Sequence, residues 1–190
     1  MARSNPRRPA PVPDAPRPAA AGAEPARPPS LAAATLPRVW QGVGYRPLAD
    51  PGLARPLFDY AAVPWPPVAP AVAWGAFTAA GGDERLVAAL VGERAERAMM
   101  LHGPVVVEGE TPLEIAAQLV AAVLDHAAAL GVETVYARPQ GLDRVWVRFG
   151  FVPVPESTLP AALAGRPGVG LYGWRGGTAL WTFREPAEDV

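Results

Sequence analysis

The sequence predicts an α/β fold, in which a mixed, mostly antiparallel sheet contains a pair of parallel strands and carries a long crossover helix. Three observations support this. Short apolar segments separated by glycine and proline turns fill the first half of the chain, which is typical of antiparallel strands. An apolar stripe at three- and four-residue steps over 113–130 predicts a long helix. Apolar strands flank that helix, and a crossover of this length joins parallel strands.

The N-terminal segment differs in composition from the rest of the chain. Its first thirty residues carry nine prolines, five arginines and, Met1 aside, one apolar side chain larger than alanine or proline, Val12. Such a stretch buries too little surface to offset its ordering entropy. We therefore expect a disordered tail rich in proline, arginine and alanine over 1–35 and a single domain over 36–190. The tail could also tether the domain to a protein partner.

Composition excludes several classes of function. The chain has no cysteine, which rules out disulfides, thiolate nucleophiles and iron–sulfur clusters. Beyond the first thirty residues it carries 12 arginines and 16 acidic residues, whereas nucleic-acid-binding domains are usually basic. No uninterrupted apolar run approaches the roughly 18 residues of a membrane span, and the N-terminus lacks an apolar signal core. We expect a cytoplasmic protein that binds neither nucleic acid nor membrane.

The domain opens with a predicted strand over 40–46, which Pro47 and the turn at 50–52 end. A short helix is expected over 53–60. The four prolines of 63–70 then predict a stiff, extended connector.

An antiparallel hairpin follows, with strands over 71–78 and 85–91 joined by the turn Gly81-Gly82-Asp83. The charged residues of 93–97 predict a solvent-facing turn. A third apolar strand spans 99–107 and contains Gly103-Pro104. Because proline removes a ladder donor, we expect a bulge or a local parting of strands there.

The strongest single prediction is the long helix. Thr111, Pro112 and Glu114 have the residue types of a capping box with proline at the first helical position, and Gly131 ends the helix. The remaining expected elements are a strand over 132–137, a short helix over 142–149, a strand over 151–154, a loop over 155–168, and a terminal hairpin of strands over 169–174 and 178–183.

Three motifs, in this order of elements, resemble the GNAT superfamily of N-acetyltransferases. Tyr45-Arg46-Pro47-Leu48, with Asp50, is similar to the opening of the family's first strand. Residues 145–151 (VWVRFGF) resemble the end of its last short helix, and 172–181 resemble its closing hairpin. The resemblance covers about 40–185.

The resemblance implies a GNAT-like fold, with a splayed central pair of parallel strands. It also implies the transfer of an acetyl group from acetyl-CoA to an amine of a small molecule or peptide. It places the thioester against backbone N–H groups of the strand residues Val105, Val106 and Val107. It places the pyrophosphate at the start of the long helix, at Gly109 and Thr111.

The pyrophosphate loop departs from the family's pattern. It has one glycine, no basic residue and three carboxylates, those of Glu108, Glu110 and Glu114. Each solvated carboxylate near a phosphate adds repulsion on the order of 1 kcal/mol. The loop is therefore a degenerate pyrophosphate loop. Three carboxylates could also hold a divalent cation, but a solvated turn with a helix cap is the favoured interpretation, and no metal site is predicted.

The acid that protonates the departing thiolate also differs. Trp146 stands where the family often has a tyrosine, and an indole N–H cannot supply that proton at useful cost. Tyr136 is the nearest phenol that could substitute, although a ring packed in the core is the simpler interpretation.

Candidate bases are few, since the chain has two histidines. His102 lies on the third strand before Gly103-Pro104, and the alternative is a hydrogen-bonded core histidine. Glu156 could face the acceptor, or lie in a surface loop. His126, off the apolar stripe, is expected at the surface.

Two functions remain open. One is an acyl-CoA-dependent N-acyltransferase. The other is a non-catalytic GNAT-like domain that binds a protein or small ligand, with the acidic helix start replacing the phosphate site.

Overall fold

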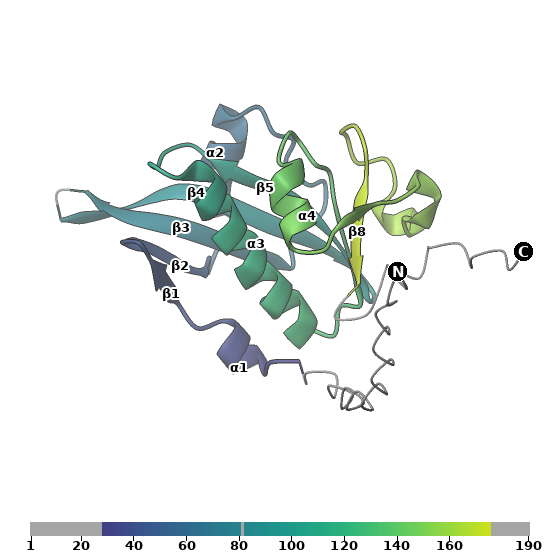
Figure 1. Ribbon diagram of the computed structural model, residues 1–190, viewed down its shortest axis with the longest axis horizontal. Helices are drawn as coiled ribbons and strands as arrows, with labels where there is room; N and C mark the ends of the chain where they lie inside the picture. The colour runs from purple at the N-terminus through teal and green to yellow at the C-terminus, as the bar shows by residue number, and fades with distance from the viewer. Residues whose placement is uncertain (1–27, 81, 176–190) are drawn as a thin grey trace, which may run out of the picture.

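The computed structural model describes residues 28–80 and 82–175. Over these residues it contains one eight-stranded sheet, in the order β1-β2-β3-β4-β5-β6-β8-β7, with helices on both faces (Figure 1). The strands are β1 (Arg38–Trp40), β2 (Val43–Pro47), β3 (Val72–Ala80), β4 (Asp83–Ala95), β5 (Ala98–Val106), β6 (Thr134–Ala137), β7 (Val152–Pro153) and β8 (Tyr172–Arg175). The helices are α1 (Leu31–Ala34), α2 (Arg55–Tyr60), α3 (Pro112–Ala129) and α4 (Asp143–Arg148), with 3₁₀ turns η1 (Pro51–Ala54), η2 (Glu156–Thr158) and η3 (Ala161–Leu163).

The parallel pair β5 and β6 diverges in the middle of the sheet. Only Ala98–Leu101 of β5 pairs with β6, opposite Thr134–Ala137, whereas β5 itself continues to Val106. The β4–β5 register also shifts, between Ala89 and Val91, close to Gly103-Pro104. The described pairings are otherwise antiparallel. The predicted fold class and the parting of strands at Gly103-Pro104 are therefore confirmed.

The long helix α3 lies across one face of the sheet and buries most of its apolar stripe (Figure 1). Leu113, at its start, is an exception and is half exposed. By length and composition alone α3 could cross a membrane, but half of it is buried inside the domain, as in the core helix of a soluble protein. On the other face, Phe58 of α2 packs against Val105 and its neighbours on β4.

Three local predictions were wrong. Residues 40–46 are not one strand: β1 and β2 form a hairpin whose turn, Gln41-Gly42, has positive φ at both residues. Residues 93–97 are not all a turn, because β4 runs to Ala95 and the side chain of Glu93 is buried. The capping box does not form, since the side chain of Thr111 makes no cap hydrogen bond.

The last residues of the predicted tail contain a short helix. Within its last residues, 28–35, the structure has α1, which contacts α3 and buries Ala34. The rest of the tail, residues 1–27, lies outside the described residues, as does the predicted strand over 178–183. The boundary at residue 35 stays a prediction.

Candidate functional site

A pocket of about 440 Å³ opens where β5 and β6 diverge. Four segments line it: β5, the start of α3, the connector after α2, and the turn after β6. Among the described residues that line it, none has a charged side chain, and Gln140 is the polar one. The lining residues are Ala61, Ala62, Val63, Pro64, Pro104, Val105, Val106, Pro112, Leu113, Gln140 and Leu142.

Two residues in the walls of this pocket have unusual backbone conformations. Ala62 and Gln140 are not glycines, yet their φ angles are +53° and +48°. Such conformations cost on the order of 1–3 kcal/mol and are concentrated at ligand-binding and active sites. The surrounding structure therefore holds both residues in backbone conformations that non-glycine residues rarely adopt.

The inner edge of β5 offers a backbone donor to this pocket. The N–H of Val107 donates to the Val87 carbonyl of β4, at 2.9 Å. Because successive amides of a strand point to opposite sides, the N–H of Val106 points away from β4, toward the side from which β6 has departed. A carbonyl oxygen in the pocket could accept from it.

The start of α3 leaves few amides free. Pro112 has no N–H, and the N–H groups of Glu114 and Ile115 both donate to the Thr111 carbonyl at 3.0 Å. Among the described residues, the N–H of Leu113 has no partner. Gly109, in the preceding loop, has a φ of +144°, and a Cβ there would overlap Ile115 Cδ1. This loop therefore accepts only glycine at position 109 without strain.

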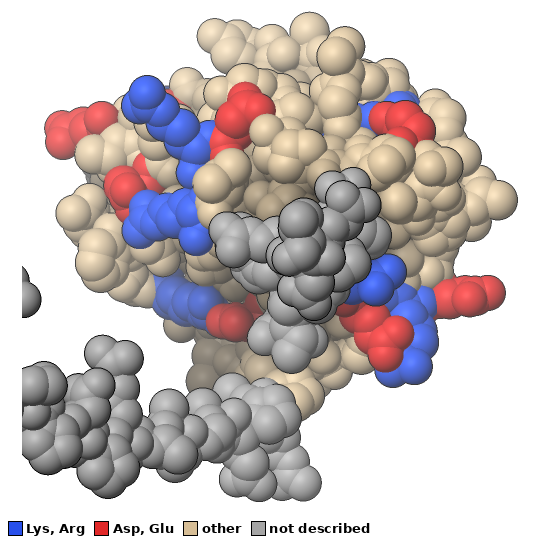
Figure 2. Space-filling model, turned by 45° about the vertical axis from the view of Figure 1, so that its right-hand side comes forward, with Lys and Arg blue, Asp and Glu red and all other residues tan. Residues whose placement is uncertain are grey.

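Two of the three carboxylates at this helix start are neutralised by arginines from elsewhere in the chain. Arg148 of α4 bonds to Glu114 at 2.8 Å, and Arg85 of β4 to Glu108 at 2.9 Å. Within the described segments, Glu110 has no ion-pair partner. Opposite charges lie side by side elsewhere too, as the left and lower right margins of Figure 2 show. Local sequence reasoning missed these arginines, because the chain returns to this point from distant positions.

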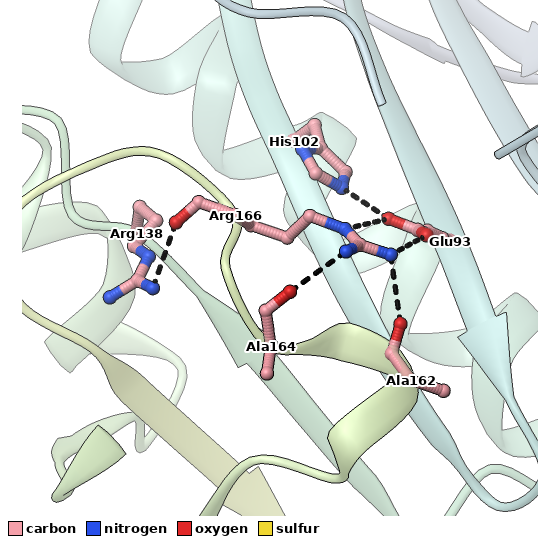
Figure 3. A network of polar contacts seen from close by, with 6 residues as sticks. All are labelled: Glu93, His102, Arg138, Ala162, Ala164 and Arg166. Atoms are coloured by element: carbon pink, nitrogen blue, oxygen red, sulfur yellow. Dashed lines mark hydrogen bonds and ion pairs between the residues drawn. The ribbon is translucent and has the colours of Figure 1, made fainter. Parts of the chain in front are cut away.

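The structure places His102 in a buried polar cluster on the other side of the sheet from α3. Its Nε2 lies 3.2 Å from Oε2 of Glu93 on β4 (Figure 3). Arg166, from the segment after η3, donates through Nε to the same oxygen at 2.9 Å and through Nη2 to Oε1. His102 does not line the pocket, although Pro104, two residues further along β5, does.

The pKa values of this cluster follow from burial and charge. Burial opposes ionisation of Glu93, but the hydrogen bonds and charges of Arg166 and His102 together hold the pKa of its carboxyl below the usual value. Burial lowers the pKa of His102; Glu93 opposes this shift, and the charge of Arg166 adds to it. At neutral pH, Glu93 is an anion and His102 is neutral.

The other two predicted catalytic residues involve the loop over 155–168: Glu156 belongs to it, and Tyr136 contacts it. Glu156 pairs with Arg138, which follows β6 and also donates to the Arg166 carbonyl at 3.0 Å. The hydroxyl of Tyr136 donates to the Thr158 carbonyl at 2.7 Å. Its ring lines a second pocket of about 400 Å³, formed with residues 95–98, 133–134 and 160–162. His102 and Glu156 thus belong to one polar network, and Tyr136 lies beside it.

Arg138 is enclosed on all sides. Its side chain is 7% exposed, and Gly168 passes so close that a Cβ there would approach it to 3.0 Å. Its Nε has no partner among the described residues. In the sequence, a single arginine directly after an apolar strand was the signal that could have marked Arg138 as a buried charge. The signal for Glu93 was weaker, because Glu93 begins a charged run.

Two further aromatic contacts correct or complete the sequence interpretation. His126 is not a surface residue: it is partly buried, and its Nδ1 accepts from Trp74 Nε1 at 3.1 Å. Burial lowers its pKa. Trp146 is fully buried, and its Nε1 donates to the Pro139 carbonyl at 3.2 Å. Among the residues described, no three acidic or histidine side chains form a metal-binding group.

No protein-family model matches this sequence, and no curated protein matches it. Solved structures do match. N-acetylglutamate synthase from Neisseria gonorrhoeae, complexed with coenzyme A and L-arginine, aligns with 72% of this chain at 14% identity and a TM-score of 0.54. The same synthase with coenzyme A and N-acetyl-glutamate aligns with 73% of the chain at 14% identity and a TM-score of 0.53.

A GNAT-family acetyltransferase from Staphylococcus aureus aligns with 55% of the chain, at 16% identity and a TM-score of 0.47. The matches cover 34% and 36% of the two synthase chains and 66% of the staphylococcal one, so this chain spans about a third of the synthase's length.

Proposed function

We propose that this chain, which has the GNAT fold, is an acyl-CoA-dependent N-acyltransferase that moves an acetyl group from acetyl-CoA to an amine of a small molecule or peptide. The observation that carries the proposal is the uncharged pocket where β5 and β6 diverge, with the Val106 N–H facing the gap. Its size and apolar walls suit a pantetheine arm ending in an acyl group. We also propose that the protein and its reaction are cytoplasmic.

In this proposal the cofactor-binding residues divide into two groups. Val105 and Val106 form the wall of the pocket, and the Val106 N–H orients the thioester carbonyl. Val107, Gly109 and Thr111 belong to the loop that leads to α3, where the diphosphate would lie. Arg148, held by Glu114, is a nearby cation that could meet a phosphate after giving up its present partner.

The reaction needs a proton acceptor and a proton donor. The amine nitrogen attacks the thioester carbonyl, the N–C bond forms, the C–S bond breaks, and the amine loses a proton. His102 is the proposed base, since it is neutral at pH 7. The departing thiolate takes a proton, for which Tyr136 is the proposed donor; its hydroxyl must first leave the Thr158 carbonyl. Glu156, exposed and paired with Arg138, is proposed to face the acceptor.

The alternative is a GNAT-fold domain that binds a protein or small ligand without catalysis. Two observations favour it: Glu110 adds a charge at the start of α3 that no described residue pairs with, and the indole of Trp146 is committed to the Pro139 carbonyl. Partners of the N-terminal tail would belong to this function.

Calorimetric titration with acetyl-CoA separates the two. The enzyme proposal expects saturable binding, followed by release of free coenzyme A when a panel of amines is supplied. His102→Gln should then lower turnover at least about a hundredfold, with coenzyme A affinity unchanged. Absence of binding at millimolar acetyl-CoA would leave only the alternative, and full activity of His102→Gln would remove it as the base.

A further inference from the structure

We propose that Glu93 and Arg166 are positioning residues for His102: the carboxylate of Glu93, locked by Arg166, fixes the ring proton on Nε2 and leaves Nδ1 as the free base. The catalytic meaning of this arrangement rests on the proposed function. The arrangement itself can be measured without any substrate.

The geometry between Glu93 and His102 follows from the register of two strands. Glu93 of β4 pairs with Met100, and His102 of β5 pairs with Val91, so the two side chains are diagonal neighbours on one face of the sheet. A carboxylate can only accept a hydrogen bond. The 3.2 Å contact with Glu93 therefore requires a proton on Nε2 of His102. In a neutral ring, Nδ1 then carries the lone pair.

Arg166 holds Glu93 in that position. Its guanidinium donates to both carboxylate oxygens, and such a bidentate pair fixes the orientation of the carboxylate. The same guanidinium donates to the carbonyls of Ala162 and Ala164, at 2.8 and 2.9 Å, so η3 and the residues after it are tied to β4 (Figure 3). Glu93 is 2% exposed and Arg166 13% exposed, which keeps water from competing for these bonds.

The charges around His102 have opposite effects on its protonation. Glu93 on β4 favours the imidazolium, and Arg166 after η3 disfavours it. Two further charged residues lie beyond Arg166. Arg138, after β6, donates to the Arg166 carbonyl and pairs with Glu156 of η2. On the side of α2, Phe58 approaches Gly103, the next residue. In the described part of the chain, these are the charged groups of the network.

The ring nitrogens of His102 report this arrangement directly. The full chain contains two histidines, so ¹⁵N-labelled, untagged protein gives two imidazole spin systems, assigned with His102→Gln. We expect His102 of the wild type to be protonated at Nε2 and unprotonated at Nδ1 at pH 7.5. Glu93→Gln should change or mix the tautomers, because the amide can donate to Nε2. It should also lower the pKa of His102, because the carboxylate that favours the imidazolium is gone. Arg166→Gln should raise that pKa.

Glu156→Gln is the matched control. It removes a second carboxylate–arginine pair that anchors the same loop, but no histidine contacts that pair. The tautomer and the pKa of His102 should not change. The signals of His126, whose Nδ1 accepts from Trp74, are an internal reference that no variant should move.

Two results would overturn the inference: a wild-type His102 protonated at Nδ1, or a Glu93→Gln protein with wild-type tautomer and titration. If Glu93→Gln does not fold, Arg166→Gln tests the inference instead. An unchanged or lowered pKa of His102 in that variant would contradict it. With an amine that the wild type acetylates, the acid limb of the kcat/KM–pH profile should move to higher pH in Arg166→Gln. If no amine is acetylated, the proposed function fails while the NMR result still stands.

Discussion

Gly109 lies in the loop from β5 to α3, and two separate features oppose any side chain there. Its φ of +144° is a conformation that other residues rarely adopt, and an added Cβ would overlap Ile115 Cδ1, a core atom of α3. Gly131, at the other end of α3, also has a positive φ, of +74°, but has open space around it. The pair separates backbone strain from steric overlap.

We predict that Gly109→Ala lowers the free energy of unfolding by about 2–4 kcal/mol, from backbone strain together with overpacking. Gly131→Ala should cost about 1–2 kcal/mol, from backbone strain alone. Urea denaturation followed by tryptophan fluorescence measures both. Equal losses in the two variants would mean that Ile115 moves aside freely.

At the scale of elements, the start of α3 and the end of α4 share one ion pair. Glu114 and Arg148 are each about half exposed, at 43% and 54%, so the pair adds little to stability. The pair matters more for ligand binding, because the carboxylate of Glu114 repels a phosphate and pairs with Arg148, which would otherwise attract one.

Glu114→Gln should therefore tighten coenzyme A binding about fivefold, the equivalent of roughly 1 kcal/mol of repulsion removed. Adding Glu110→Arg should tighten it further. Glu133→Gln is the control: it makes the same charge change near the far end of α3, where Glu133 pairs with Arg97 at 2.5 Å, and should leave the Kd unchanged. Titration calorimetry measures all three, and unchanged or weaker affinity in Glu114→Gln would contradict the placement of the diphosphate.

At the scale of the whole molecule, buried histidines make stability depend on pH. Burial lowers the pKa of both His102 and His126 below the ordinary value of 6.5. The unfolded chain therefore binds protons at a higher pH than the folded one, and stability falls as the pH drops below 6.5. The lowered pKa values of Glu84, Glu93 and Glu156 act in the same direction, but below their ordinary value of 4.5.

We expect the free energy of unfolding to decrease between pH 6.5 and 5, by at most about 1.4 kcal/mol per pH unit for each histidine. His126→Asn places an amide oxygen near the position of Nδ1, keeps an acceptor for Trp74, and should reduce this slope. Urea unfolding at pH 7.5, 6.0 and 5.0 measures it. A wild-type stability that is constant over this range would contradict the neutral state of the buried His102 ring and the partly buried His126 ring.

The order of the secondary-structure elements could be predicted from the sequence, because hydrophobic periodicity and turn residues are local properties. The stripe of α3, its proline start and its glycine end follow from positions near one another in the chain. The parting of strands at Gly103-Pro104 has an equally local cause, the missing amide of proline. Where local signals were ambiguous, the boundaries were wrong, as at Glu93, whose charge hides a buried strand position.

The fold class and the parting of strands at Gly103-Pro104 could thus be inferred from the sequence, whereas the choice of His102 as the base stays a prediction. Which charges meet depends on the folded chain: Arg148 pairs with Glu114, and Glu93 pairs with His102 and Arg166. Ion pairs depend on distance in space, and these partners lie up to 73 residues apart in the chain. No local pattern could have selected one arginine from the 17 in the sequence.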